Sequence, residues 1–168
     1  MQMLDPCVRK YRALSALKVR DNFLDYFKLS KDDVMGFYWP KENEITPLSI
    51  VKEVSCDLAL PKYDFFARWE KGDPLVSSDR FGLQPAGNEK TTPMTLLLPI
   101  KQFDRFGFAV EAREGFYNTF LKTGQQIIRT IGLAFASEEV DNLSKKTHDI
   151  PLDYIITEKE IIRCGFSS

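Results

Sequence analysis

The first apolar residues of the chain recur at the spacing of an amphipathic helix, from Tyr11 to Phe27. Asp5-Pro6 precedes them and is a good helix start. An aspartate accepts hydrogen bonds from the unpaired first amides of a helix, and a proline lacks one of those amides. The pattern predicts one or two helices over residues 6–28.

Two pairs of apolar runs predict two β-hairpins. Residues 34–39 read as a buried strand and residues 46–56 are rich in β-branched side chains, so residues 33–56 are predicted to form a hairpin. Residues 94–100 and 106–110 predict a second one. The first of these two runs is continuously apolar, which is typical of a central strand.

The middle of the chain, residues 60–93, has no regular pattern. Residues 63–69 combine aromatic and charged side chains and predict a short helix, which the turn residues from Gly72 onward end. Residues 77–93 carry repeated Gly and Pro and predict a loop, long enough to serve as a lid or a pocket rim.

Apolar residues at spacings of three and four return over residues 116–135 and predict a long amphipathic helix. Gly124 lies on its apolar stripe, where a missing side chain would let the helix approach the sheet closely. Residues 138–146 are expected to prolong or cap this helix, and residues 147–153 to form a linker.

The end of the chain carries a helix-start signal. Thr157 and Glu160 have the spacing of a capping box, in which the hydroxyl accepts from the amide of Glu160 and the carboxylate reaches back to the amide of Thr157. We therefore expect one α/β domain over residues 1–150. Residues 151–168 would then be a linker and the start of a truncated helical segment.

The predicted order is helix, hairpin, irregular segment, hairpin and long helix. This order predicts an α+β fold, in the broad sense α/β, with helices flanking an antiparallel sheet of four to five strands. GAF and PAS sensory modules are built in this way, so the expected architecture is a GAF/PAS-like sandwich.

Composition narrows the function classes. The chain has 168 residues, 43% of them hydrophobic, and a net charge of -1, which is typical of a globular domain and gives no basic excess for binding nucleic acid or membranes. Its three cysteines are widely spaced and indicate a reduced, cytoplasmic setting. No apolar run approaches the length of a membrane span.

Catalytic patterns are missing from the sequence. The single histidine, His148, lies in a polar stretch and is interpreted as a surface residue, so no serine or cysteine has a predicted base. Carboxylates are scattered and fit solvated faces and turns, and no glycine-rich phosphate loop or metal-ligand spacing is present. We expect no enzyme activity, no cofactor and no metal.

Aromatic residues make 12% of the chain and suggest either a Phe-rich core or the walls of a pocket. The sequence places a candidate ligand-binding site on an aromatic segment that ends in Asp73-Pro74. Its residues are Tyr38, Tyr63, Phe65, Trp69 and Asp73. The alternative is that Trp69 covers the core and Asp73 starts a turn.

Two stretches resemble LuxR-type transcription regulators. Residues 156–164, with Thr157 and Glu160, resemble the opening of the DNA-binding domain of that family, and Asp73-Pro74 is similar to the Asp-Pro of its autoinducer-binding domains. The resemblance implies a quorum-sensing sensor domain without its helix-turn-helix. Asp73 would then receive the amide of a small-molecule signal.

Three functions follow as expectations. The first is a ligand-sensing or dimerising regulatory module, a homodimer or a heterodimer with a full-length regulator, which itself binds no nucleic acid and no membrane. The second is a stand-alone interaction module with a GAF-like fold and no small ligand. The third is an enzyme of unfamiliar type that uses carboxylates in residues 60–90.

Overall fold

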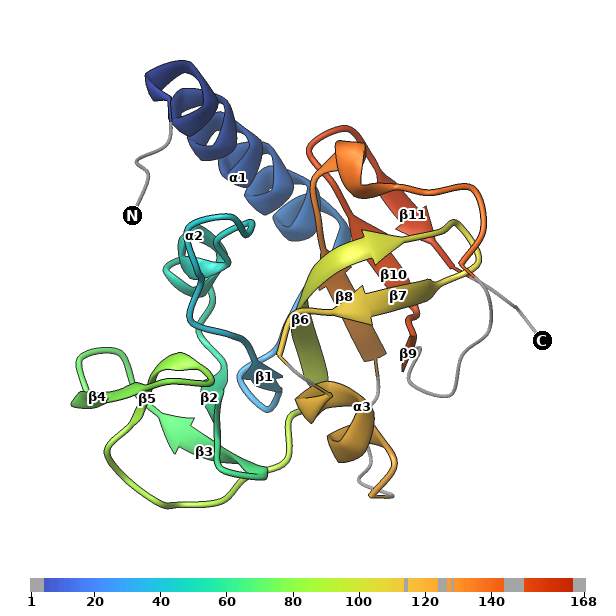
Figure 1. The fold of residues 1–168 in the computed structure, drawn as a ribbon. Helices are drawn as coiled ribbons and strands as arrows, with labels where there is room; N and C mark the ends of the chain where they lie inside the picture. The colour runs from blue at the N-terminus through green and yellow to red at the C-terminus, as the bar shows by residue number, and fades with distance from the viewer. Residues whose placement is uncertain (1–4, 114, 124–126, 128, 144–149, 165–168) are drawn as a thin grey trace.

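The structure is a computed structural model and describes residues 5–113, 115–123, 127, 129–143 and 150–164 (Figure 1). The elements along the chain are α1 (Pro6–Tyr26), β1 (Val34–Gly36), α2 (Leu48–Val51), β2 (Asp57–Lys62), β3 (Phe65–Trp69), β4 (Leu75–Ser78), β5 (Gly82–Pro85), β6 (Thr95–Phe103), β7 (Phe108–Glu111), α3 (Phe116–Leu121), β8 (Arg129–Leu133), the 3-10 helix η1 (Ala136–Glu138), β9 (Ile150–Pro151), β10 (Tyr154–Ile156) and β11 (Ile161–Arg163).

A mixed sheet with a parallel centre forms the body of the molecule. Within the described residues it has nine strands, ordered β11-β10-β8-β6-β1-β2-β3, with β7 paired to β6 and β9 paired to β7. The strands β10, β8, β6, β1 and β2 run parallel. The predicted antiparallel sheet of four to five strands, and with it the GAF/PAS-like sandwich, is therefore wrong.

The strand order reverses at β1. From β1 the chain first adds β2 on one side, and later returns to add β6, β8 and β10 successively on the other side. β1 ends beside Leu96, so the loop that follows it leaves the sheet alongside the second half of β6, at a topological switch point. In open α/β sheets this is where a crevice for ligands forms.

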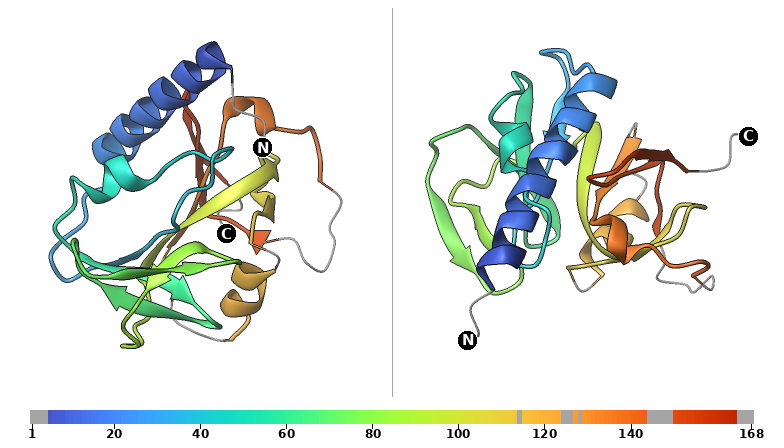
Figure 2. Two further views of the ribbon diagram at one scale, coloured as in Figure 1. Left: turned by 60° about the vertical axis from the view of Figure 1, so that its left-hand side comes forward. Right: turned by 90° about the horizontal axis from the view of Figure 1, so that it is seen from above.

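Both faces of the central strands are buried. Leu97 faces the cluster that contains Val19 and Phe23 of α1, whereas its neighbours Leu96 and Leu98 face the cluster that contains α3. Successive side chains of a strand point to opposite faces, so a continuously apolar run requires a cover on each side. Figure 2 shows α1 and α3 on different sides of the sheet.

The helix over residues 6–28 is confirmed as α1. The side chain of Asp5 accepts a hydrogen bond from the amide of Cys7 at 2.7 Å, and Pro6 opens the first turn. The second predicted hairpin is also confirmed, because β6 and β7 pair in antiparallel fashion and β6 lies inside the sheet.

The first predicted hairpin is wrong. β1 pairs with β2 in parallel, and residues 48–51 form the short helix α2 rather than a strand. The β-branched residues Ile50, Val51 and Val54 are buried on one side of this turn. Their spacing suits a helical turn as well as a strand, and contact with α1 decides between the two.

The middle of the chain is more regular than its pattern predicts. Residues 65–69 form strand β3 instead of a helix, paired with β2 along its length. The predicted loop over residues 77–93 contains most of the β4–β5 hairpin. Along β3 only Phe65 and Arg68 are half-buried and the other residues are buried, so burial does not follow a two-residue period, and the pairing with β2 defines the strand.

The long helix predicted over residues 116–135 is also wrong. Its first part is α3, but residues 129–133 form strand β8, hydrogen-bonded between β6 and β10. Short apolar runs suit a buried strand and a buried helix equally, and pairing with β6 decides here. The predicted packing glycine, Gly124, lies outside the described residues.

The helix predicted at Thr157 is a β-turn between β10 and β11. The Thr157 hydroxyl accepts from the amides of Lys159 and Glu160, at 3.1 and 3.2 Å, as a cap would. The Glu160 carboxylate instead accepts from Arg105 at 2.6 Å, and the backbone continues as β11. Both strands belong to the main sheet, and the division of domains at residue 150 stays a prediction.

No helix in the described part of the chain is long and apolar enough to span a membrane.

Gly107 provides a test of the β6–β7 turn. Its φ is +98°, and a Cβ there would lie 2.8 Å from both the Cys164 Cβ and the Leu152 carbonyl oxygen. We expect Gly107→Ala to lower the free energy of unfolding by about 2–4 kcal/mol, because strain and overlap add. Urea denaturation measures this.

The control for Gly107 is Gly87→Ala. A Cβ at Gly87 would meet no atom within 4 Å. A change within about 0.5 kcal/mol is expected there. Equal losses for the two variants would contradict the assigned turn.

Candidate functional site

A cavity of about 470 Å³ lies at the switch point of the sheet, and we refer to it as the Arg113 cavity. It is bordered by the loop after β1, the β4–β5 turn, β6, the segment after β7, and η1. Its lining residues are Lys41, Asn43, Glu44, Arg80, Ile100, Lys101, Ala112, Arg113 and Glu138.

A buried ion pair forms one wall. Arg113 is fully buried and the side chain of Glu44 is 8% exposed, and two guanidinium nitrogens meet the two carboxylate oxygens at 2.5 and 2.8 Å. Arg113 also donates to the carbonyl oxygens of Trp39 and Ala112, each at 3.0 Å. A bidentate pair with further acceptors offsets much of the cost of burying a guanidinium.

Two buried tyrosines lie beside this pair. The Arg113 guanidinium carbon is 5.7 Å from the centre of the Tyr38 ring, and the Tyr38 hydroxyl donates to the Ile45 carbonyl oxygen. Burial raises the pKa of Tyr38 and of Tyr117, so both phenols stay neutral. Among the described residues, the Tyr117 hydroxyl and the Arg113 Nε have no hydrogen-bond partner.

Cations surround the opening of the cavity. Lys41 and Lys101 are exposed, and Arg80 packs its guanidinium 5.4 Å from the centre of the Phe116 ring. Together with Arg113 they outnumber the two lining carboxylates. The cavity therefore favours an anionic ligand.

Glu138 adds a group that titrates near neutral pH. Burial raises the pKa of Glu138 from 4.5 to about 7, against the opposing effect of a 2.8 Å hydrogen bond from the Phe135 amide. A carboxyl with this pKa can donate or accept a proton under physiological conditions.

The five ligand-binding residues predicted from the sequence are not gathered in one place. Tyr38 lies under Arg113, whereas Tyr63 is 64% exposed and its ring centre is 6.0 Å from that of Phe65. The Trp69 indole donates to the Asp73 carbonyl oxygen at 3.1 Å. The Asp73 carboxylate accepts from a backbone amide of its own turn. Their role in binding stays a prediction.

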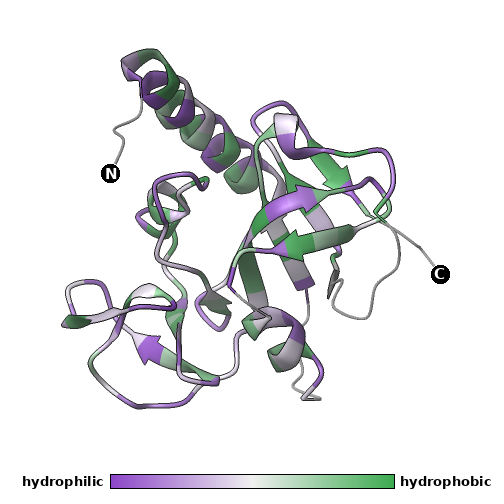
Figure 3. Cartoon of the chain, viewed as in Figure 1, coloured by the Kyte–Doolittle hydropathy of each residue, from purple (hydrophilic) through white to green (hydrophobic). Residues whose placement is uncertain are grey.

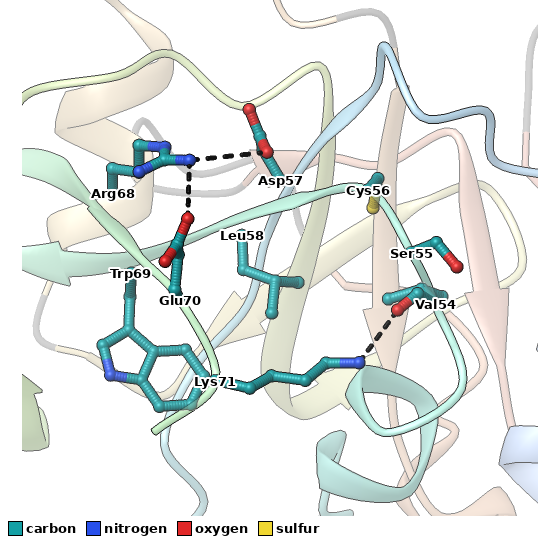
Figure 4. Close-up of a pocket in the computed structure, with 9 residues that line it drawn as sticks. All are labelled: Val54, Ser55, Cys56, Asp57, Leu58, Arg68, Trp69, Glu70 and Lys71. Atoms are coloured by element: carbon teal, nitrogen blue, oxygen red, sulfur yellow. Dashed lines mark hydrogen bonds and ion pairs between the residues drawn. The ribbon is translucent and has the colours of Figure 1, made fainter. Parts of the chain in front are cut away.

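A second, smaller pocket of about 270 Å³ lies near Trp69 (Figure 4). Its charged residues already have partners. Arg68 lies 3.0 Å from Glu70 and 3.8 Å from Asp57, and Lys71 donates to a carbonyl oxygen after α2 at 2.9 Å. These contacts account for the polar lining, so the Arg113 cavity is the better candidate site.

Nucleophile and metal chemistry have little support in the described part of the chain. No group of three or more His, Cys, Asp or Glu residues there could hold a metal ion. Burial raises the pKa of the Cys56 thiol, and raises that of Cys164 to about 12, so neither forms a thiolate readily. His148 lies outside the described residues.

Comparison with known proteins identifies the fold. No protein-family model and no curated protein matches the sequence. Among solved structures, the chain is similar to Aquifex aeolicus 5,10-methenyltetrahydrofolate synthetase, with 22% identity, a TM-score of 0.78, and coverage of 98% of this chain and 87% of the other. The corresponding enzyme of Mycoplasma pneumoniae gives 18% identity, a TM-score of 0.66, and coverage of 92% and 90%.

These similarities correct the functional expectations. Structures that match nearly the whole chain are those of enzymes of folate metabolism, not of LuxR-type sensors, so the resemblance built on Thr157, Glu160 and Asp73-Pro74 is wrong. The expected regulatory module in transcription and quorum sensing is overturned with it, as is the expectation of a protein without enzyme activity. At these identities the comparison establishes the fold alone.

Removing one partner of the buried ion pair tests its importance. We expect Arg113→Met to lower the free energy of unfolding by about 3–5 kcal/mol, because it leaves the Glu44 carboxylate buried without a counter-charge. The double variant Arg113→Met/Glu44→Leu should lose much less free energy of unfolding than the sum of the losses of Arg113→Met and Glu44→Leu alone. Urea denaturation of all three variants measures the coupling.

The control for this experiment is Arg20→Met, which breaks the exposed ion pair with Asp21 at 3.0 Å. Exposed pairs contribute about 0–1 kcal/mol. A loss at Arg113 as small as the loss at Arg20 would show that the buried pair is not a structural constraint.

The raised pKa of Glu138 predicts a pH dependence. Between about pH 4.5 and 7 the unfolded chain has lost the Glu138 proton while the folded chain keeps it. The free energy of unfolding therefore falls as pH rises through this window. Compared with Glu138→Gln, we expect the wild type to lose about 2 kcal/mol more between about pH 5 and pH 8.

Glu42→Gln is the matched control, because Glu42 is exposed beside the same cavity loop. It should follow the wild-type pH profile in urea denaturation. Identical profiles for Glu138→Gln and the wild type would exclude the raised pKa.

Proposed function

We propose that this chain is an enzyme of folate metabolism that binds a folate derivative in the Arg113 cavity. One observation carries the proposal: a mixed-charge cavity opens at the switch point of the sheet, between the loop after β1 and the second half of β6. A volume of about 470 Å³ lies within the range of small-molecule sites. The similarity to 5,10-methenyltetrahydrofolate synthetases supports the choice of ligand.

The chemistry of a folate matches the lining. The glutamate end of a folate carries carboxylates, which Lys41, Lys101 and Arg80 are placed to bind. The pterin end carries an amino group and ring N–H groups, which can share the oxygens of the Glu44 carboxylate. The ion pair with Arg113 holds that carboxylate in place, so it binds without reordering.

Glu138 supplies the proton step. A methenyl bridge joins two nitrogens of the folate through one carbon. When it closes on a formyl group, the second nitrogen forms a bond to the formyl carbon and loses its N–H proton, the C–O bond breaks, and the oxygen leaves as water after taking up that proton and one from solvent. A carboxyl whose pKa is about 7 can receive this proton or return it. We assign Glu138 this role, and assign the chain to the cytoplasm, where its three unpaired cysteines would stay reduced.

Ligand binding tests the proposal directly. The purified chain is titrated with folic acid and with tetrahydrofolates, and tryptophan fluorescence is followed, because Trp39 contacts Arg113 through its carbonyl oxygen. We expect Lys101→Glu to weaken binding at least about tenfold, since it replaces attraction to a ligand carboxylate with repulsion.

Lys31→Glu is the charge-matched control. Lys31 is exposed in the turn before β1, at the opposite end of that strand from the cavity. It should bind as the wild type does. Absence of binding to every folate, or equal weakening by both variants, would overturn the assigned site.

Turnover is tested separately. Tetrahydrofolates that carry a one-carbon group are incubated with the chain, and the 5,10-methenyltetrahydrofolate formed or consumed is measured by chromatography. Glu138→Gln should slow the reaction about 100-fold or more while leaving folate binding within about threefold. Binding without any turnover would remove the enzymatic part of the proposal and keep the ligand.

A further inference from the structure

The outer face of α1 carries an apolar pair between opposite charges. Lys10, Leu14, Leu17 and Asp21 follow one another at spacings of four, three and four, and we call them the α1 stripe. At 3.6 residues per turn these positions lie along one side of a helix. All four side chains are exposed, Leu14 by 49% and Leu17 by 41%.

The opposite side of α1 is fixed to the body of the protein. Ala16, Val19 and Phe23 are buried, and the Asn22 side chain donates to the Thr157 carbonyl oxygen at 3.1 Å. α1 lies on the outside of the molecule, and hydrophobic and hydrophilic residues alternate around its turns (Figure 3). The α1 stripe is therefore a preformed surface, and a partner would not have to order it.

The α1 stripe is complementary to itself. If two copies of α1 pack antiparallel about a two-fold axis between Leu14 and Leu17, each Leu14 meets the Leu17 of the other copy. The same operation sets each Lys10 opposite the other copy's Asp21. An isologous interface requires this kind of self-complementarity.

We propose that a second copy of this chain docks on the α1 stripe, so that the protein forms an antiparallel α1–α1 dimer. Charge complementarity selects this occupant. Among the described residues, Lys10 has no ion-pair partner, and Asp21 forms an ion pair only with its half-buried neighbour Arg20, at 3.0 Å. A surface pair of this kind is rearranged at little cost.

The dimer is expected to be weak. Two helices that meet along a few turns bury less surface than a standard protein interface, which needs about 1,200–2,000 Å². The association should therefore depend on protein concentration. The inference is independent of the folate proposal, because the α1 stripe shares no residue with the Arg113 cavity.

Charge reversal tests the arrangement. Sedimentation equilibrium over a range of concentrations gives the dissociation constant of the dimer. We expect Lys10→Glu alone and Asp21→Lys alone each to weaken the dimer at least about tenfold, because each sets like charges opposite one another twice. The double variant Lys10→Glu/Asp21→Lys should restore the wild-type constant within about threefold, because opposite charges again face each other.

The double variant is also suited to the helix itself, because it brings a negative charge toward the N-terminus and a positive charge toward the C-terminus. Circular dichroism checks that each variant is folded. Leu14→Asp tests the apolar centre and should weaken the dimer at least about tenfold, while Lys31→Glu should leave it unchanged. A monomer at every concentration, or a dimer insensitive to the single reversals, would overturn the proposal.

Discussion

The buried ion pair between Arg113 and Glu44 is the constraint on which the site depends. It joins two segments that are 69 residues apart, the loop after β1 and the segment after β7. A guanidinium that is fully removed from water must keep its carboxylate and carbonyl partners, so both segments are held in one conformation. Tyr38 packs against this pair from the loop that it fixes.

The parallel centre of the sheet explains why polar chemistry gathers at one place. Its strands are apolar and covered on both faces where they pair in parallel, so functional groups lie beyond that pairing, as Lys101 does in the last part of β6. Where the order of strands reverses, the loop after β1 separates from the second half of β6 and leaves room between the two. The Arg113 cavity occupies this room, and its cations come from segments that are distant in the sequence.

Local sequence patterns predict local structure in this chain, such as the start of a helix or a hairpin, but not which distant segments pair in the sheet. Asp5-Pro6 correctly predicts the start of α1, and the apolar runs of β6 and β7 correctly predict the hairpin that they form. The same reasoning failed for β8, whose apolar run also fits a helix, and at Thr157, whose hydroxyl caps a turn with the same bonds that cap a helix. In both cases pairing with a neighbouring strand determines that the segment is extended rather than helical. A local sequence pattern carries no information about pairing between distant segments.

The Arg113 cavity could not be predicted from the sequence for the same reason. Glu44, Lys101 and Arg113 are ordinary charged residues in the sequence, and only the fold brings them together. α1 depends on both local sequence and the fold. Local capping determines where it begins, and the fold determines what it contacts. Arg12 of α1 contacts the loop after β1, which borders the Arg113 cavity, by donating to the Glu42 carbonyl oxygen at 3.1 Å. Since Leu14 and Leu17 lie on its outer side, contacts made there leave this link to the cavity intact.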